Sequence, residues 1–433
     1  MRKLYLFSAS MLVSGTVLPL SVSAQSGVGG NEDELSVKIV EYKDSTDTYK
    51  TLHENAPKLK GVPDVPRFAL HGKEGKFYMG IGTNIKVVPL YDFGNPIPDD
   101  NMFITSAIPM HIAPGNGGQF RFSAQQSNIY LNVVALPGTK NQLGAYVSIN
   151  FLGNGYAPNL QLAYLRFWGF TAGYNYSLFT DISACPATID YEGPNSFACQ
   201  KYGNVYYEQT FGKKNQWKAG IGIDMPSNSF TNATHTSTVT QRVPDIPFYV
   251  QRSWCDGKGW LRLSGIVRNL YYRNETAQKN VDKVGWGVKA SGMSPLGSGF
   301  TAYYQAVYGK GIASYIQDLG GTGMDLMPDP GSSSRLKAVE AWGAFGALQY
   351  NFSPSLFCTA MYSHVRTYAG EYTDSSVPWG TGYKYAQYVL GNLFWQVTPI
   401  VQVGVEYIYG RRVDFDRSQA HDNRIQAMLQ VSF

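Results

Sequence analysis

The chain ends in the stretch Ile425-Gln-Ala-Met-Leu-Gln-Val-Ser-Phe433, in which the odd positions are apolar and the even positions are mostly polar. Successive side chains of a β-strand point to opposite faces of the sheet. The stretch therefore predicts a strand with one apolar face and one polar face. In a transmembrane β-barrel, such a strand turns its apolar face to lipid and its other face to the lumen.

The other end of the chain predicts export. A basic head, Met1-Arg2-Lys3, precedes an apolar stretch up to about Val22, and small residues lead up to Ala24 before Gln25. This order is typical of a signal peptide over residues 1–24 with cleavage between Ala24 and Gln25; a membrane anchor is the alternative. A last strand ending in Phe resembles the recognition signal of barrel-assembly machinery. Together, the two ends predict the outer membrane of a Gram-negative bacterium.

The composition favours strands and excludes several classes of protein. Aromatic residues make up 14% of the 433 residues, and the 46 glycines suit tight turns. After residue 24 there is no run of about eighteen apolar residues, which excludes a helical membrane protein. The net charge of +5, or +3 without Arg2 and Lys3, is too small to indicate a nucleic-acid partner.

Residues 25–75 differ from the rest of the chain because they are charged and contain few aromatic side chains. They include a heptad-like stripe that is too short to form a stable isolated helix. We expect a periplasmic N-terminal segment that is either a mostly disordered tail or a short associating helix. The stripe consists of Leu35, Ile39, Tyr42, Thr46 and Tyr49.

From Lys76 onward, apolar and polar residues alternate, as in Trp217–Asp224 and Val401–Tyr409. One such run could belong to a half-buried soluble sheet, whereas many in succession are typical of a barrel in lipid. We predict an all-β fold for residues 76–433, a 16-stranded antiparallel transmembrane β-barrel. An even number of strands would place both termini in the periplasm. The predicted strands cover 76–92, 118–136, 141–153, 159–168, 169–179, 203–211, 215–226, 246–256, 259–273, 283–296, 298–311, 338–352, 354–368, 383–397, 399–413 and 422–433.

The connections between these segments alternate between short and long, as expected of periplasmic turns and outer loops. The third long connection, residues 180–202, carries Asp181, Asp190 and Glu192. In many sixteen-stranded porins the third outer loop folds inward, so this loop is a candidate constriction; an ordinary surface loop is the alternative. Cys185 and Cys199 suggest a loop disulfide in an oxidising compartment, although sequence does not settle the pairing.

Several stretches resemble the DcaP-like family of trimeric outer-membrane porins, in matching order from about residue 68 to the end. The resemblance implies a homotrimer, an N-terminal periplasmic helix and a preference for small anionic solutes. The chain departs from the family in its short N-terminal segment and in the loop cysteines. The stretches are Phe170–Phe179, Asp181–Pro194, Val243–Ile246, Leu263–Arg268, Tyr308–Ile312 with Tyr315, and Gly404–Arg411 with Arg424–Gln426.

The sequence contains no recognisable catalytic or metal-binding pattern. The six histidines are scattered, and no two have the spacing of metal ligands. No glycine-rich loop ends in the Lys-Ser or Lys-Thr that binds phosphate. We therefore expect no enzymatic activity, no cofactor and no metal.

The alternation of side chains between the two faces of each strand indicates the function better than the search for catalytic motifs does. If the apolar parity faces lipid, the basic residues on the lumen wall outnumber Asp224 and Glu406, the only acidic ones assigned to it. An excess of one sign of charge in a narrow pore enriches counter-ions; alternatively, these residues pair with acids of the wall and loop. The basic residues assigned to the lumen are Lys86, Lys218, Arg252, Arg262, Arg268, Lys289 and Arg424.

These observations leave two hypotheses. The first is a porin in the outer-membrane lipid that allows passive diffusion of small hydrophilic solutes, preferably anionic ones that bear carboxylates. The second is a non-transporting barrel that acts as an adhesin or envelope-interaction protein through its outer loops. Ion conductance through a lipid bilayer distinguishes the two.

Overall fold

The computed structural model describes residues 38–41, 47–58, 68–72, 75–227, 229–372 and 382–433. The expected signal peptide and its cleavage site lie outside these residues. Three positions of the heptad-like stripe, at 35, 42 and 46, also lie outside them. Of the remaining two positions, Ile39 is in a strand and Tyr49 is in a helix, so the stripe does not form one continuous helix.

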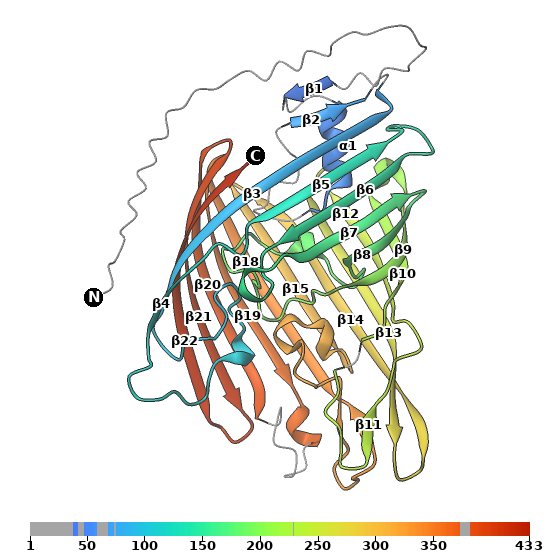
Figure 1. Ribbon diagram of the computed structural model, residues 1–433, viewed down its shortest axis with the longest axis vertical. Helices are drawn as coiled ribbons and strands as arrows, with labels where there is room; N and C mark the ends of the chain where they lie inside the picture. Colours follow the sequence, from blue (N-terminus) through green and yellow to red (C-terminus); the bar gives the residue numbers. More distant parts are fainter. Residues whose placement is uncertain (1–37, 42–46, 59–67, 73–74, 228, 373–381) are drawn as a thin grey trace, which may run out of the picture. The chain divides into compact units, whose positions relative to one another are not determined.

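In the described part of the chain, sixteen antiparallel strands form a closed barrel (Figure 1). Each strand pairs with the next along the chain, and β22 pairs with β3 to close the ring. The predicted fold class is confirmed. The barrel strands are β3 (Phe77–Asp92), β5 (Asn128–Ala135), β6 (Leu143–Asn150), β7 (Asn159–Phe167), β8 (Phe170–Tyr176), β9 (Lys201–Phe211), β10 (Trp217–Asp224), β12 (Ile246–Trp254), β13 (Gly259–Asn274), β14 (Lys279–Gly297), β15 (Phe300–Lys310), β18 (Glu340–Ser353), β19 (Leu356–Thr367), β20 (Tyr383–Thr398), β21 (Val401–Asp414) and β22 (Gln419–Ser432).

Shorter elements complete the described structure. The short strands are β1 (Lys38–Glu41), β2 (Phe68–His71), β4 (Gln119–Ser123), β11 (Thr236–Thr238), β16 (Leu326–Pro328) and β17 (Leu336–Ala338). The α-helix is α1 (Asp47–Asn55), and the 3-10 helices are η2 (Thr105–Ala107), η3 (Asn154–Tyr156), η4 (Ile182–Ala184), η5 (Lys213–Asn215), η6 (Ala313–Tyr315), η7 (Gln317–Leu319) and η8 (Ala369–Tyr372). Within the described ranges, no helix is both long enough and apolar enough to cross a membrane.

The alternation of the sequence becomes an inner and an outer face of the barrel. On β22, Ile425 is 48% exposed on the outside, whereas its neighbour Arg424 is fully buried on the inside. The same period of two continues around the ring, so the outer surface is a band of exposed Ile, Leu, Val and aromatic side chains. This arrangement is the one expected of a barrel that faces lipid.

The segment predicted as a single strand at 118–136 is broken in two. β4 and β5 both pair with β3, and residues 124–127 between them leave the sheet. On one side of the barrel the wall is short, because β5, β6, β7 and β8 have only 8, 8, 9 and 7 residues. By comparison, β14 has 19 residues.

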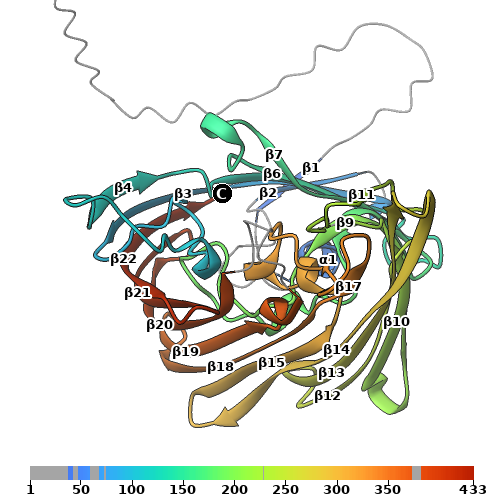
Figure 2. The ribbon, with the colours of Figure 1, turned by 90° about the horizontal axis from the view of Figure 1, so that it is seen from below.

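The N-terminal elements belong to the barrel instead of forming a separate domain. β2 pairs with the end of β3, and β1 pairs with β2. Helix α1 lies inside the ring (Figure 2). Its residues Tyr49 and Leu52 are buried against the inward-facing side chains of Tyr78 and Val134.

The apolar core of the molecule also lies inside the ring, where long loops pack against each other and against the wall. The connection between β8 and β9, residues 177–200, contributes Phe179 and Ala198, and residues 311–339 contribute Ile312, Tyr315 and Leu319. We call residues 177–200 the inward loop. It corresponds to the loop predicted at 180–202.

Candidate pore constriction and lumen wall

The middle of the inward loop is fixed to the barrel wall by a buried carboxylate. The main-chain N–H groups of Ile189 and Asp190 donate hydrogen bonds to the two carboxylate oxygens of Glu406 on β21, each at 2.9 Å. The Nδ2 of Asn392 on β20 donates to the main-chain oxygen of Ala187 at 3.0 Å. Two adjacent N–H groups on one carboxylate hold the loop in a single register.

A second anchor holds the later part of the loop. The hydroxyl of Ser363 on β19 donates to Oδ1 of Asn195 at 2.6 Å, and the N–H of Ser196 donates to the same hydroxyl at 3.1 Å. Gln305 on β15 donates to the main-chain oxygen of Ser196 at 3.1 Å. The loop leaves the wall at β8 and is bonded to β15, β19, β20 and β21, so it extends across the lumen.

The acidic residues predicted in this loop are buried in the lumen. Asp190 accepts hydrogen bonds from the N–H of Phe103 and the hydroxyl of Tyr388. Burial, followed by the nearby Glu406, raises the pKa of Asp190 to about 7. Both carboxylate oxygens of Glu192 lack a hydrogen-bond partner among the described residues, and burial together with Asp318 raises its pKa well above the usual value. Asp190 and Glu192 therefore carry less negative charge near neutral pH than two ordinary carboxylates would.

Most of the basic residues predicted on the lumen wall do face the lumen, but several are neutralised there. Arg268 is fully buried and forms ion pairs of 2.9 Å with both Asp245 and Asp325. Arg424 pairs with Asp92 at 2.7 Å, and Lys218 pairs with Glu208 at 2.9 Å. The predicted excess of positive charge is therefore smaller than the sequence count suggested.

The count of charges from the sequence omitted the four acids that form these ion pairs. Asp92 and Glu208 lie at inward parity on β3 and β9, so the alternation rule could have placed both. Asp245 and Asp325 lie outside the barrel strands, in connections that fold back into the lumen. No local pattern gives their position, because the contact joins residues far apart in the chain.

Three basic residues keep weaker partnerships. The Lys86 ammonium donates to Gln126 at 2.6 Å and to the main-chain oxygen of Ile189 at 3.0 Å. Arg262 lies 3.8 Å from Asp181 and stacks over the ring of Tyr249 at 4.1 Å. The Nζ of Lys289 has no hydrogen-bond partner in the described structure.

Helix α1 packs against the inner wall formed by β5, β6 and β7. The Nδ2 of Asn55 donates to Oδ1 of Asn132 at 2.7 Å and to the main-chain oxygen of Ala145 at 3.1 Å. The hydroxyl of Tyr164 and the guanidinium of Arg166 donate to the main-chain oxygen of Asn55 at 2.8 and 3.0 Å. A cation and a hydroxyl at the last carbonyls suit the negative end of a helix.

The comparisons with known proteins agree with this architecture. The family model described as "Porin subfamily" matches residues 130–427. The chain belongs to this porin subfamily. It is an outer-membrane protein of the porin fold. No curated protein matches it in sequence.

Solved structures show the same fold at low sequence identity. The porin resembles the outer membrane channel DcaP of Acinetobacter baumannii, with a TM-score of 0.70 and 17% identity over 83% of this chain and 99% of the other. It also resembles an anion-selective porin from Comamonas acidovorans, with a TM-score of 0.52 and 8% identity over 82% and 100% of the two chains. OmpF of Salmonella typhi gives a TM-score of 0.51 and 9% identity over 83% and 98%.

The prediction that Arg252 lines the pore was wrong. On β12 the outward positions are the even ones, and Arg252 is exposed on the same face as Val250 and Trp254. Its guanidinium lies 5.5 Å from the ring of Trp217. Arg252 is near the end of its strand, where a long side chain can place its charge beyond the apolar band of the porin.

The predicted disulfide is also absent. Cys185 and Cys199 are free thiols in the described structure, and both pack against an apolar cluster that includes Phe197 and Phe345. Burial raises the pKa of the Cys199 thiol to about 12. Both cysteines behave as small apolar side chains. The disulfide could not be predicted reliably because spacing in the sequence does not fix the distance between two sulfur atoms.

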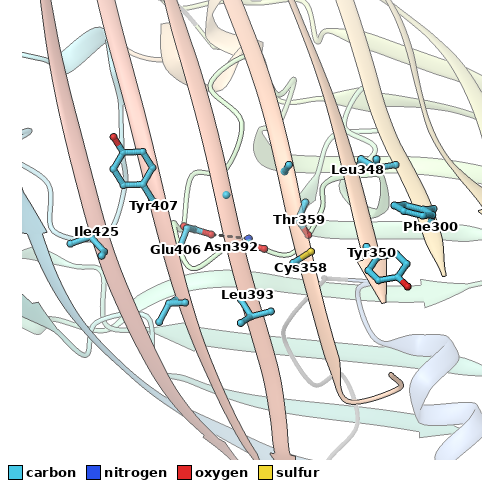
Figure 3. Close-up of a pocket in the computed structure, with 13 residues that line it drawn as sticks. Phe300, Leu348, Tyr350, Cys358, Thr359, Asn392, Leu393, Glu406, Tyr407 and Ile425 are labelled. Carbon is cyan, nitrogen blue, oxygen red and sulfur yellow. Dashed lines mark hydrogen bonds between the residues drawn. The ribbon is translucent and has the colours of Figure 1, made fainter. Parts of the chain in front are cut away.

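The outer wall of the porin carries a shallow apolar groove of about 510 Å³ (Figure 3). Leu393, Tyr407 and Ile425 lie along it. The small residues Ala360 and Gly391, which also line it, are paired on the adjacent strands β19 and β20. The groove lies on the lipid-facing surface, and its lining also includes the buried residues Thr359, Asn392 and Glu406. Within the described ranges, no group of three or more His, Cys, Asp or Glu side chains is suited to hold a metal ion.

Proposed function

We propose that this porin allows passive diffusion of small hydrophilic solutes through a lumen narrowed by the inward loop, and that it prefers anionic, carboxylate-bearing solutes. One observation carries the preference. Lys86 and Lys289 are buried ammonium groups on the inner wall, and neither has a carboxylate within ion-pair distance in the described structure. A structural neighbour of the same fold is an anion-selective porin.

The lumen contains many carboxylates, and the negative charge of several is offset by ion pairs or reduced by burial. Asp245 and Asp325 pair with Arg268, and Asp92 pairs with Arg424. In the inward loop, the pKa of Asp190 is raised to about 7 by burial and Glu406, so this carboxyl is partly neutral near pH 7. These ion pairs and the burial of Asp190 reduce the negative charge that opposes Lys86 and Lys289.

Only a modest bias is needed for selectivity. Two unit charges about 4 Å apart interact by roughly 4 kcal/mol at an effective dielectric constant of about 20. A net bias of about 1.4 kcal/mol gives about tenfold discrimination. Salt screens this interaction, so the preference should weaken at high ionic strength.

The reversal potential of the purified porin in a planar bilayer under a KCl gradient tests the proposal. The wild type should pass chloride in preference to potassium, and Lys86→Met should reduce that preference. The matched control is Lys258→Met, which removes the same charge from an exposed turn outside the lumen. Cation selectivity of the wild type would contradict the proposal and would mean that the carboxylates of the inward loop set the field.

The filled lumen favours a second candidate function. Apolar clusters made of loop residues occupy the inside of the barrel, including Ile97, Phe103 and Ile108 from residues 93–118. A barrel packed in this way could serve as an adhesin or envelope-interaction protein. Absence of any ion conductance by correctly folded protein would support this second function over diffusion.

The short wall of β5–β8 supports assembly as a homotrimer. A transmembrane β-strand needs about 9–11 residues to cross the hydrocarbon region, and these four strands have 8, 8, 9 and 7. Contact with neighbouring copies would shield the short wall from lipid. Native mass spectrometry of the detergent-solubilised porin tests this assembly, and a monomer would contradict it.

A further inference from the structure

Four polar side chains form one patch on the inner wall beneath the inward loop. On β13 and β14, Arg262 lies opposite Ser291, and Ser264 lies opposite Lys289. All four positions face the lumen. Residues directly opposite each other in an antiparallel pair have Cβ atoms about 4.5–5.5 Å apart. The four side chains therefore share a compact surface, which we call the β13–β14 patch.

Half of this patch already binds a carboxylate. The Oδ2 of Asp181 in the inward loop accepts a hydrogen bond from Ser291 at 2.8 Å and another from the indole of Trp260 at 3.0 Å. Arg262 lies 3.8 Å from the same oxygen. Burial alone would raise the pKa of Asp181, but Arg262 and Lys289 lower it below the ordinary value. The patch thus stabilises the ionised form of a carboxyl group.

The other half of the patch has no partner. Lys289 is 3% exposed and Ser264 is 6% exposed, and neither the Nζ of Lys289 nor the Oγ of Ser264 has a hydrogen-bond partner among the described residues. The Nζ lies 5.3 Å from the ring of Phe179. A buried ammonium group without a hydrogen-bonded partner is strongly unfavourable, and an adjacent anion reverses that cost.

We infer that Lys289 and Ser264 form a binding subsite for the carboxylate group of a solute in transit, next to the position held by Asp181. The inference rests on the proposed diffusion function and adds the place in the lumen where the solute binds. A carboxylate fits better than a spherical anion because its two oxygens can accept one hydrogen bond from Nζ and one from Oγ. The ring of Phe179 provides an apolar surface for the rest of the solute.

Current recordings of single porin channels in KCl, with benzoate added, test the subsite. Benzoate should interrupt the wild-type current in a concentration-dependent manner, and its neutral analogue benzamide should not. In Lys289→Met, benzoate should bind at least about tenfold more weakly, as expected for loss of one charge-assisted hydrogen bond. Ser264→Ala should weaken binding in the same direction by a smaller factor, and Lys289→Arg should retain binding.

Two controls separate a local effect from misfolding. Thr359→Val removes another buried lumen hydroxyl that has no partner in the described structure, on β19, and should leave benzoate binding unchanged. Unaltered KCl conductance of Ser264→Ala establishes that this mild variant is folded even if Lys289→Met is not.

Two results would overturn the inference while the proposed function stands. One is an anion-selective wild type whose current benzoate does not interrupt. The other is equal benzoate binding by the wild type and Ser264→Ala. A cation-selective wild type would instead refute the proposed function on which the subsite rests.

Discussion

Replacement of Asn55 by alanine should weaken the binding of helix α1 to the inner wall of the barrel. The side-chain amide of Asn55 has two N–H donors, and its acceptors are Asn132, Val133 and Ala145 at 2.7, 3.3 and 3.1 Å. At about 1 kcal/mol of net stabilisation for each of two hydrogen bonds, the loss is about 2 kcal/mol. This shifts the equilibrium between the docked and released helix by about 30-fold.

A second substitution enlarges the effect. Leu52 is fully buried on the same helix, and truncation of a buried leucine to alanine costs about 2–5 kcal/mol. The two positions are neighbours, so their effects need not add. Because α1 lies inside the ring, its release should enlarge the open cross-section. Single-channel recordings of Asn55→Ala and of the double variant with Leu52→Ala should show a new state of higher conductance, populated most in the double variant.

The control is Lys50→Ala, because Lys50 is exposed on the same helix. It should behave as the wild type. If the double variant shows the same distribution of conductance as Lys50→Ala, α1 does not restrict the channel and the reasoning fails.

Three further predictions concern the lumen. Arg268→Met leaves two buried carboxylates unpaired, so unfolding by urea in lipid vesicles should show a loss of about 3–5 kcal/mol; a loss below about 1 kcal/mol would contradict this. Deletion of residues 184–199 should raise single-channel conductance, and unchanged conductance would place the loop outside the ion path. The pKa of Asp190 is raised from 3.8 to about 7 by burial and Glu406. Docking of the inward loop should therefore weaken as pH rises from about 4 to about 7, with conductance increasing over this range, and Asp190→Asn should abolish the increase.

The sequence predicted the barrel well because each strand carries its own evidence. Alternation along β21 and β22 separates lipid-facing from lumen-facing residues without reference to any other strand. The break between β4 and β5 was missed, although the apolar positions change from even, at Phe120 and Phe122, to odd, at Ile129 and Leu131. Arg252 was misplaced although Phe248 and Val250 mark the outward parity of its strand.

The arrangement of the lumen was less accessible to sequence. The pairing of Arg268 with Asp325 joins β13 to a connection 57 residues away, and the docking of Asn55 on Ala145 joins residues 90 apart. Such contacts depend on which loop folds inward and how far it extends. Local periodicity contains no information about either, so the charge balance of the pore could only be read once the loops were in place.

The contacts of α1 with the inner wall constrain the order in which the helix and the strands assemble. Asn55 approaches the wall at Gly144 so closely that a Cβ atom there would lie 2.1 Å from Oδ1 of Asn55. Hydrogen-bond partners of Asn55 include Asn132 on β5, Ala145 on β6 and Tyr164 on β7, so these three strands must be in register before the helix can bind there. Helix α1 precedes these strands in the chain but can dock only after β5, β6 and β7 have paired. The position of α1 inside the ring therefore depends on the pairing of these three strands.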